Sequence, residues 1–150
     1  LYFVGIETKL TEPFSGTRYR LDQRPAYQRW LKAPQAPWNR DRWRDLDDVG
    51  HNQLFRDHLL AVALAERRRD MYAGGALMLV RHPSDSKCAR ALRAYAECLR
   101  DPGVVMDRPL DEIVRRWAPL VRGGPEEPWL LAFDRRFVDL SGSAAAEDKK

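Results

Sequence analysis

The first ten residues constrain the fold more than any other part of this chain. The segment Leu1-Tyr-Phe-Val-Gly-Ile-Glu-Thr-Lys-Leu10 is rich in aromatic and β-branched residues, offers no helix cap, and is followed by Thr11-Glu12-Pro13. These features predict a β-strand that ends before the proline. The first six residues are apolar on both faces, which is typical of a central strand covered on each side. We therefore expect an α/β domain built around this strand.

The rest of the chain predicts helices and one further strand. Residues 11–50 carry four prolines, which predicts a long irregular excursion with a short helix at about 26–32. Apolar residues at helical spacing predict a helix from Asn52, as N-cap, to about Asp70. Residues 76–80 form a short apolar run after two glycines, which indicates a second buried strand. Further helices are expected from Ser84 or Asp85 to Leu99, from Pro109, and from Pro128.

Length and composition indicate one domain. A chain of 150 residues, 44% hydrophobic and 32% charged, suits a single soluble domain, here residues 1–140 with a disordered tail at 141–150. No apolar stretch approaches the roughly 20 residues needed to cross a bilayer, and the opening segment lacks signal-peptide features. We therefore expect a cytoplasmic protein without a membrane partner. Because the chain opens inside a strand, we expect it to be the C-terminal portion of a longer domain.

The two cysteines and three histidines do not indicate a metal centre. Cys88 and Cys98 lie ten residues apart in a predicted helix, about 15 Å along its axis, which is beyond disulfide reach. They are expected to be reduced core residues. The spacing of His51, His58 and His82 matches no metal motif.

The excursion is strongly basic and aromatic. Residues 18–44 hold eight arginines and lysines but two aspartates, a local net charge of +6 that exceeds the +4 of the whole chain, interleaved with five tyrosines and tryptophans. Arginines suit phosphates and aromatic rings suit unpaired bases, so this segment predicts a nucleic-acid partner. In the alternative interpretation, the tryptophans pack the excursion onto the body. The candidate nucleic-acid ligands are Arg18, Arg20, Arg40, Arg42 and Arg44.

Glu7 and Lys9 form the candidate catalytic pair. Side chains alternate along a strand, so these two point to the same face, about 7 Å apart along the backbone. Phosphodiester hydrolysis needs an oxygen ligand for Mg²⁺ and a cation that stabilises charge on the phosphate. The alternative is an ordinary surface salt bridge at a solvent-facing strand end, because the Glu-x-Lys tripeptide alone is a weak signal.

Two segments carry a family resemblance. Val4-Gly-Ile-Glu-Thr-Lys-Leu-Thr-Glu-Pro-Phe-Ser15 resembles the catalytic strand and turn of a PD-(D/E)XK nuclease superfamily group with a hydrophobic-Gly-Ile-Glu-x-Lys-x-Thr-Glu-Pro-Phe-Ser signature. Gln53-Leu-Phe-Arg-Asp-His-Leu-Leu-Ala61 is similar to the helix that follows this strand in the group, and residues 77–80 to its next strand. Together these segments span about the first half of the chain.

The resemblance implies a fold, a reaction and roles for individual residues. It implies an α/β, restriction-endonuclease-like mixed sheet flanked by helices, with the catalytic strand central and the N-terminal part missing. It also implies DNA cleavage that depends on Mg²⁺ or Mn²⁺. Glu7 would ligate the metal, the carbonyl of Thr8 would add a ligand, and Lys9 would act on the attacking water or the phosphate. Gln53 would position the lysine or DNA, or be an exposed amide at the helix start.

The chain departs from the family pattern in one respect. The strand that normally supplies a metal-binding aspartate before Glu7 is absent. Asp47 and Asp48 are conceivable substitutes, but a truncated start is the simpler explanation, so we expect weak metal binding and little cleavage by this chain alone. Glu12 would be a carboxylate in the outer coordination shell of the metal, or it would cap the turn at Pro13. The alternative function is a non-catalytic nucleic-acid- or protein-binding module on the same scaffold, and the sequence leaves the oligomeric state open.

Overall fold

A parallel three-stranded sheet organises the chain. The computed structural model describes residues 1–10, 14–17, 20–48 and 50–139. Within these residues the strands are β1 (Tyr2–Lys9), β2 (Gly74–Arg81) and β3 (Val105–Pro109), in the order β1-β2-β3. Both strand pairs are parallel. The helices are α1 (Pro25–Leu31), α2 (His51–Arg67), α3 (Ser86–Ala96), α4 (Leu110–Val121) and α5 (Glu127–Phe137).

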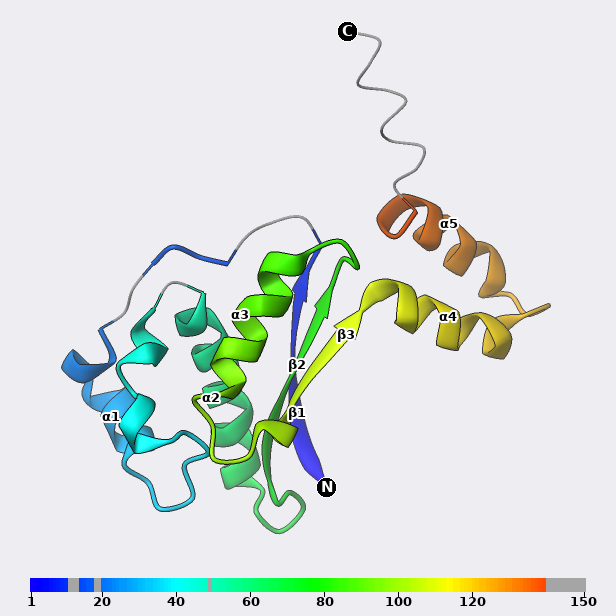
Figure 1. The fold of residues 1–150 in the computed structure, drawn as a ribbon. Helices are drawn as coiled ribbons and strands as arrows, with labels where there is room; N and C mark the ends of the chain where they lie inside the picture. The colour runs from blue at the N-terminus through cyan, green and yellow to red at the C-terminus, as the bar shows by residue number, and fades with distance from the viewer. Residues whose placement is uncertain (11–13, 18–19, 49, 140–150) are drawn as a thin grey trace, which may run out of the picture.

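Helical crossovers explain the parallel sheet. α2 lies in the connection between β1 and β2, and α3 in that between β2 and β3. Because such crossovers are right-handed and the strand order advances in one direction, both helices must cover the same face. Figure 1 shows α2 and α3 together on one side of the sheet, with the α4 and α5 pair beyond the end of β3. The α/β class predicted from the sequence is confirmed.

The position of β1 differs from the expectation of a central strand in a mixed sheet. In the described residues, β1 lies at the edge of a parallel sheet. Its alternate residues Tyr2, Val4 and Ile6 are exposed, Ile6 to 63%. The residues between them face α2, and Lys9 at the end of that face is buried. Although both faces of β1 are apolar, only the face toward α2 is covered within the described residues.

Two glycines bring α2 very close to the sheet. A Cβ atom on Gly75 would lie 2.3 Å from the backbone nitrogen of Val62, so only glycine fits here without a shift of the helix. On the neighbouring strand, a Cβ on Gly5 would lie 3.2 Å from the backbone oxygen of Asp57 and 3.3 Å from the Cβ of Ala61. This close packing places the first half of α2 beside the carboxyl end of β1.

A buried hydrogen-bond chain ties the excursion to the core. The indole Nε1 of Trp38 donates to the Tyr95 hydroxyl at 2.8 Å, and that hydroxyl lies 2.9 Å from His58 Nδ1. His58 Nε2 lies 3.2 Å from the carbonyl oxygen of Gly75. Because a carbonyl can only accept, Nε2 carries the proton and Nδ1 accepts from Tyr95. With His58 neutral, each polar side-chain atom of Trp38, Tyr95 and His58 has a hydrogen-bond partner. Burial lowers the pKa of His58 to about 4.

Acid should therefore weaken the fold through His58. An unfolded histidine gains a proton as the pH falls below about 6.5, whereas the folded one resists protonation until about pH 4. The stabilisation is thus complete above about pH 6.5 and is lost as the pH falls through this window. At pH 4.5 the free energy of unfolding is therefore about 2 to 3 kcal/mol lower than above pH 6.5. Urea unfolding at several pH values, with His58→Gln as a non-titrating comparison, measures it; an equal pH dependence in both proteins would contradict the prediction.

Several predicted elements need correction at their ends. α2 begins at His51 with Gly50 as N-cap, at φ 93°, and not at Asn52, because Gly50 readily adopts the left-handed backbone that turns the chain into the helix. Asn52 is instead buried in the first turn. Pro109 ends β3 and precedes α4, so the helix starts one residue later than predicted. Asp85 caps α3 as expected, through a bond from the backbone nitrogen of Cys88.

The excursion is more ordered than predicted. Besides α1, the described residues of this segment contain three short 3-10 helices. Four of its residues belong to the buried core: Leu21, Leu31, Trp38 and Leu46. This outcome confirms the packing interpretation for Trp38, whereas Trp43 is only partly buried. Cys88 and Cys98 are free and buried, as expected. The predicted tail lies outside the described residues.

None of the described helices is both long enough and apolar enough to span a membrane.

Candidate functional site

The carboxyl end of β1 meets the amino end of α2 at a cluster of polar side chains. Glu7 and Lys9 project from β1 on the face covered by α2, as strand alternation predicts. From α2 come Gln53 and Asp57, which are four residues apart and so lie on one face of the helix. These four residues form the candidate site.

Hydrogen bonds hold three members of the site in one arrangement. Lys9 Nζ lies 3.1 Å from Glu7 Oε1 and donates to Gln53 Oε1 at 3.3 Å. The Gln53 amide nitrogen donates to Glu7 Oε1 at 2.6 Å, and its oxygen also accepts from the backbone nitrogen of Ser15 at 3.0 Å. These three contacts fix the side chains of Glu7 and Lys9 relative to Gln53. Gln53 is therefore a member of the site and not an exposed amide at the helix start.

The burial of Lys9 argues against an ordinary surface salt bridge. Lys9 is 5% exposed and its ammonium lies 5.2 Å from the centre of the Phe14 ring. Exposed ion pairs contribute little to stability, and burying two charges costs several kcal/mol per ion before their attraction is counted. A buried lysine that keeps a carboxylate and an amide as partners is typical of a site where the charge is used.

Asp57 is the site residue that sequence reasoning missed. The pKa of Asp57 is raised to about 6, chiefly by burial and also by the negative charge of Glu7 and by hydrogen bonding with the Glu7 carboxyl. Its Oδ2 atom is buried and has no hydrogen-bond partner among the described residues. The four-residue spacing from Gln53 was the available signal. Two carboxyl groups thus face each other beside a lysine.

The substitute acids considered from the sequence lie elsewhere. Asp47 accepts a hydrogen bond from the backbone nitrogen of Leu21 at 2.8 Å, and Asp48 ends the 3-10 helix Asp45–Asp47. Thr8 is exposed, and its side chain points to the opposite face of β1 from Glu7. Glu12 lies outside the described residues.

The candidate arginines do not form one cluster around the site. Arg42 pairs with Asp45 and lies 3.8 Å from Glu97, so its charge is partly compensated. Arg40 and Arg44 are exposed and line a pocket in the excursion. Arg20 is exposed, with a left-handed backbone at φ 44°, and Arg18 lies outside the described residues.

The arrangement can bind a cation and act on an anion. Two adjacent carboxyl groups, one of them with an unpartnered oxygen, offer hard oxygen ligands. The lysine beside them offers a fixed positive charge for a phosphate. Among the described residues no three His, Cys, Asp or Glu side chains are grouped to hold a metal ion by themselves. A cation here would rely on two carboxylates together with water or substrate oxygens.

The fold and the site define an α/β protein with a carboxylate-lysine pair at the end of a parallel strand. The family model of the PD-(D/E)XK nuclease superfamily matches residues 1–139. The chain belongs to this superfamily. No curated protein and no solved structure matches it significantly.

Proposed function

We propose that this chain hydrolyses phosphodiester bonds of DNA with the help of Mg²⁺ or Mn²⁺. The observation that carries the proposal is the buried, hydrogen-bonded set of Glu7, Lys9 and Gln53 with Asp57 against Glu7. Superfamily membership supports a nuclease-like activity. Asp57 would serve as the second acidic residue beside Glu7.

Glu7 and Asp57 are the residues that would hold the metal. Mg²⁺ keeps several waters and usually takes only one or two carboxylates from the protein, so this pair suffices. The unpartnered, buried Oδ2 of Asp57 is the atom that a cation would satisfy. The raised pKa of Asp57 means that this carboxyl takes up a proton more readily than a free aspartate does, and a bound cation would compete with that proton. When bound, the metal supplies a more acidic water and neutralises phosphate charge.

Lys9 and Gln53 position and stabilise the reacting groups. An ammonium has three N–H donors, and Glu7 and Gln53 engage two of those of Lys9 among the described residues. The third is left for a phosphate oxygen or a water. Gln53 contacts both Glu7 and Lys9 and so fixes the geometry between carboxylate and cation. Charge that develops on the phosphate is then met by a donor already in place.

A cleavage assay tests the proposal directly. We expect the chain to cut labelled single-stranded or duplex DNA in Mg²⁺ or Mn²⁺ and to stop in EDTA. Little cleavage was expected from the sequence, where Asp47 and Asp48 were the conceivable second acids and a truncated start was the simpler explanation. Asp57 changes that expectation. Binding of DNA without metal-dependent cleavage would favour the alternative, a non-catalytic binding module.

The basic excursion should supply much of the DNA affinity. Each phosphate contact contributes about 0.7 to 0.9 to the slope of log affinity against log salt. Replacing Arg40 and Arg44 with Gln should therefore weaken binding and flatten the slope by about 1.5. Arg42→Gln is the matched control, because Arg42 is already paired with Asp45, and should change the slope less. Titrations of labelled DNA at several salt concentrations measure both; an unchanged slope in the double variant would show that these arginines do not contact phosphates.

A further inference from the structure

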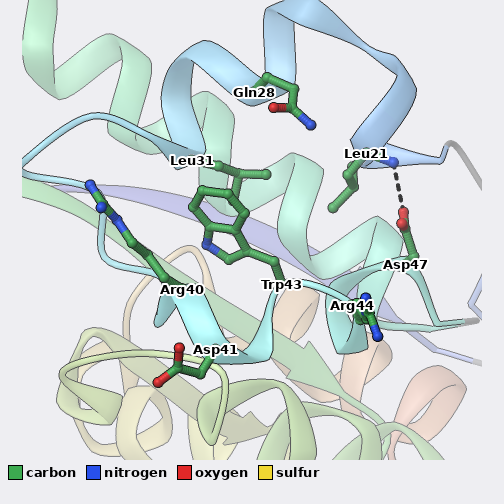
Figure 2. A pocket seen from close by; sticks show the side chains of 8 residues that line it. All are labelled: Leu21, Gln28, Leu31, Arg40, Asp41, Trp43, Arg44 and Asp47. Atoms are coloured by element: carbon green, nitrogen blue, oxygen red, sulfur yellow. Dashed lines mark hydrogen bonds between the residues drawn. The ribbon is translucent and has the colours of Figure 1, made fainter.

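A pocket lies in the excursion, apart from the four residues of the candidate site. It encloses about 380 Å³ between α1 and the 3-10 helix Arg40–Arg42. Figure 2 shows the Trp43 indole at the centre of the view, with the amide of Gln28 above it and Arg40 and Arg44 on opposite sides. Leu21 and Leu31 complete the apolar walls.

Trp43, which lines the pocket, carries an unsatisfied hydrogen-bond donor. Trp43 Nε1 is buried and has no hydrogen-bond partner among the described residues. Leaving such a donor unpaired is costly, so a small shift of the indole that brings Nε1 to an acceptor on a bound molecule would be favoured. The carboxylate of Asp47 is already engaged by the backbone nitrogen of Leu21. Asp41 lies exposed at the rim and can accept from an amino group of a ligand.

We infer that this pocket takes one unpaired nucleobase of a bound strand, with the adjacent phosphates at Arg40 and Arg44. This inference rests on the proposed function for the identity of the partner. The indole and the two leucines match the flat, apolar faces of a base. The exposed carboxylate of Asp41 can accept from an amino group on the polar edge of the base, and Arg40 and Arg44 match the backbone charge. A base within a duplex is stacked and cannot enter, so the bound nucleotide is single-stranded or flipped out.

Removing the bases from the ligand gives the first test. Anisotropy titrations in EDTA compare a labelled 12-nucleotide strand with a strand of the same length that is abasic throughout. We expect the chain to prefer the strand with bases by about tenfold, since one base stacked on an aromatic side chain has an effect of this order. Trp43→Ala should reduce the preference to below about twofold and leave the affinity for the abasic strand unchanged. Trp117 is a half-exposed tryptophan on α4. Trp117→Ala is the matched control and should keep the full preference for the strand with bases.

A crosslinking experiment needs no variant and so covers the case in which Trp43→Ala does not fold. A strand that contains 5-iodouracil is irradiated on the unmodified chain, and the modified peptide is mapped by mass spectrometry. Crosslinking at Trp43 is the expected result. Crosslinks confined to other aromatic residues, or equal affinity for the abasic strand, would overturn the inference.

The two proposals fail in different ways. Metal-dependent cleavage without a preference for bases would overturn the pocket inference and leave the proposed function standing. A preference for bases that depends on Trp43, without any cleavage, would support the pocket and contradict the proposed reaction. Absence of binding to either strand would overturn the pocket inference.

Discussion

Lys9→Ala should slow metal-dependent DNA cleavage by about 10²- to 10³-fold. Lys9 is buried and is held by Glu7 and Gln53, and its proposed role is to stabilise charge on the phosphate. Such a group acts mainly on the charge that develops in the transition state, so DNA affinity should change little. Single-turnover cleavage at saturating protein, measured beside anisotropy titrations of the same DNA, separates the two effects.

Two variants control this prediction. Lys32→Ala removes an exposed lysine from the excursion and should leave the cleavage rate of bound DNA unchanged. Lys9→Met keeps most of the side-chain volume and should lose cleavage as Lys9→Ala does, which excludes a cavity as the cause. Cleavage by Lys9→Ala at the wild-type rate would refute the catalytic role of this lysine. If the cleavage rate falls only as much as the DNA affinity does, Lys9 is a DNA-binding residue and not a catalytic one.

Gly75→Ala should destabilise the fold by about 3 kcal/mol. The added Cβ would meet the backbone of α2 at 2.3 Å from the nitrogen of Val62 and 2.5 Å from the carbonyl carbon of Ala61. Backbone atoms cannot rotate away as a side chain can, so the helix must move off the sheet. That movement would also separate Gln53 and Asp57 from Glu7. Chemical denaturation measures the loss of stability.

The neighbouring glycine provides a matched control. A Cβ on Gly74 would meet only the ring of Tyr2, at 3.2 Å, and that side chain is half-exposed and free to shift. Gly74→Ala should therefore change the free energy of unfolding by less than about 1 kcal/mol. Equal effects of the two substitutions would show that the approach of α2 to β2 is not as close as described.

The placement of Glu7 and Lys9 on one face could be predicted from the sequence because it depends only on local geometry. Alternation along a strand places Glu7 and Lys9 on one face whatever surrounds them. The family resemblance added Gln53. Asp57 was missed because its role depends on how closely α2 approaches β1, and that distance is set by Gly5 and Gly75 acting from two different strands.

Elements that depend on long-range contacts were also missed. β3 was not predicted because only two of its five residues, Val105 and Met106, are aliphatic. It forms by pairing with β2, and Arg81 reinforces the pairing by donating to both carboxylate oxygens of Asp107, at 2.9 and 3.0 Å. The chain from Trp38 through Tyr95 to His58 likewise joins residues far apart in the sequence.

Binding of Mn²⁺, followed by the electron paramagnetic resonance signal of the free ion, tests the central claim most directly. We expect a saturable site in the unmodified chain that Glu7→Gln and Asp57→Asn each weaken by at least about tenfold, because each removes one of two carboxylate ligands. Asp48→Asn, at the acid considered from the sequence alone, should leave the affinity unchanged. Unaltered Mn²⁺ binding in Asp57→Asn, or its loss in Asp48→Asn, would contradict the claim that Glu7 and Asp57 together hold the metal.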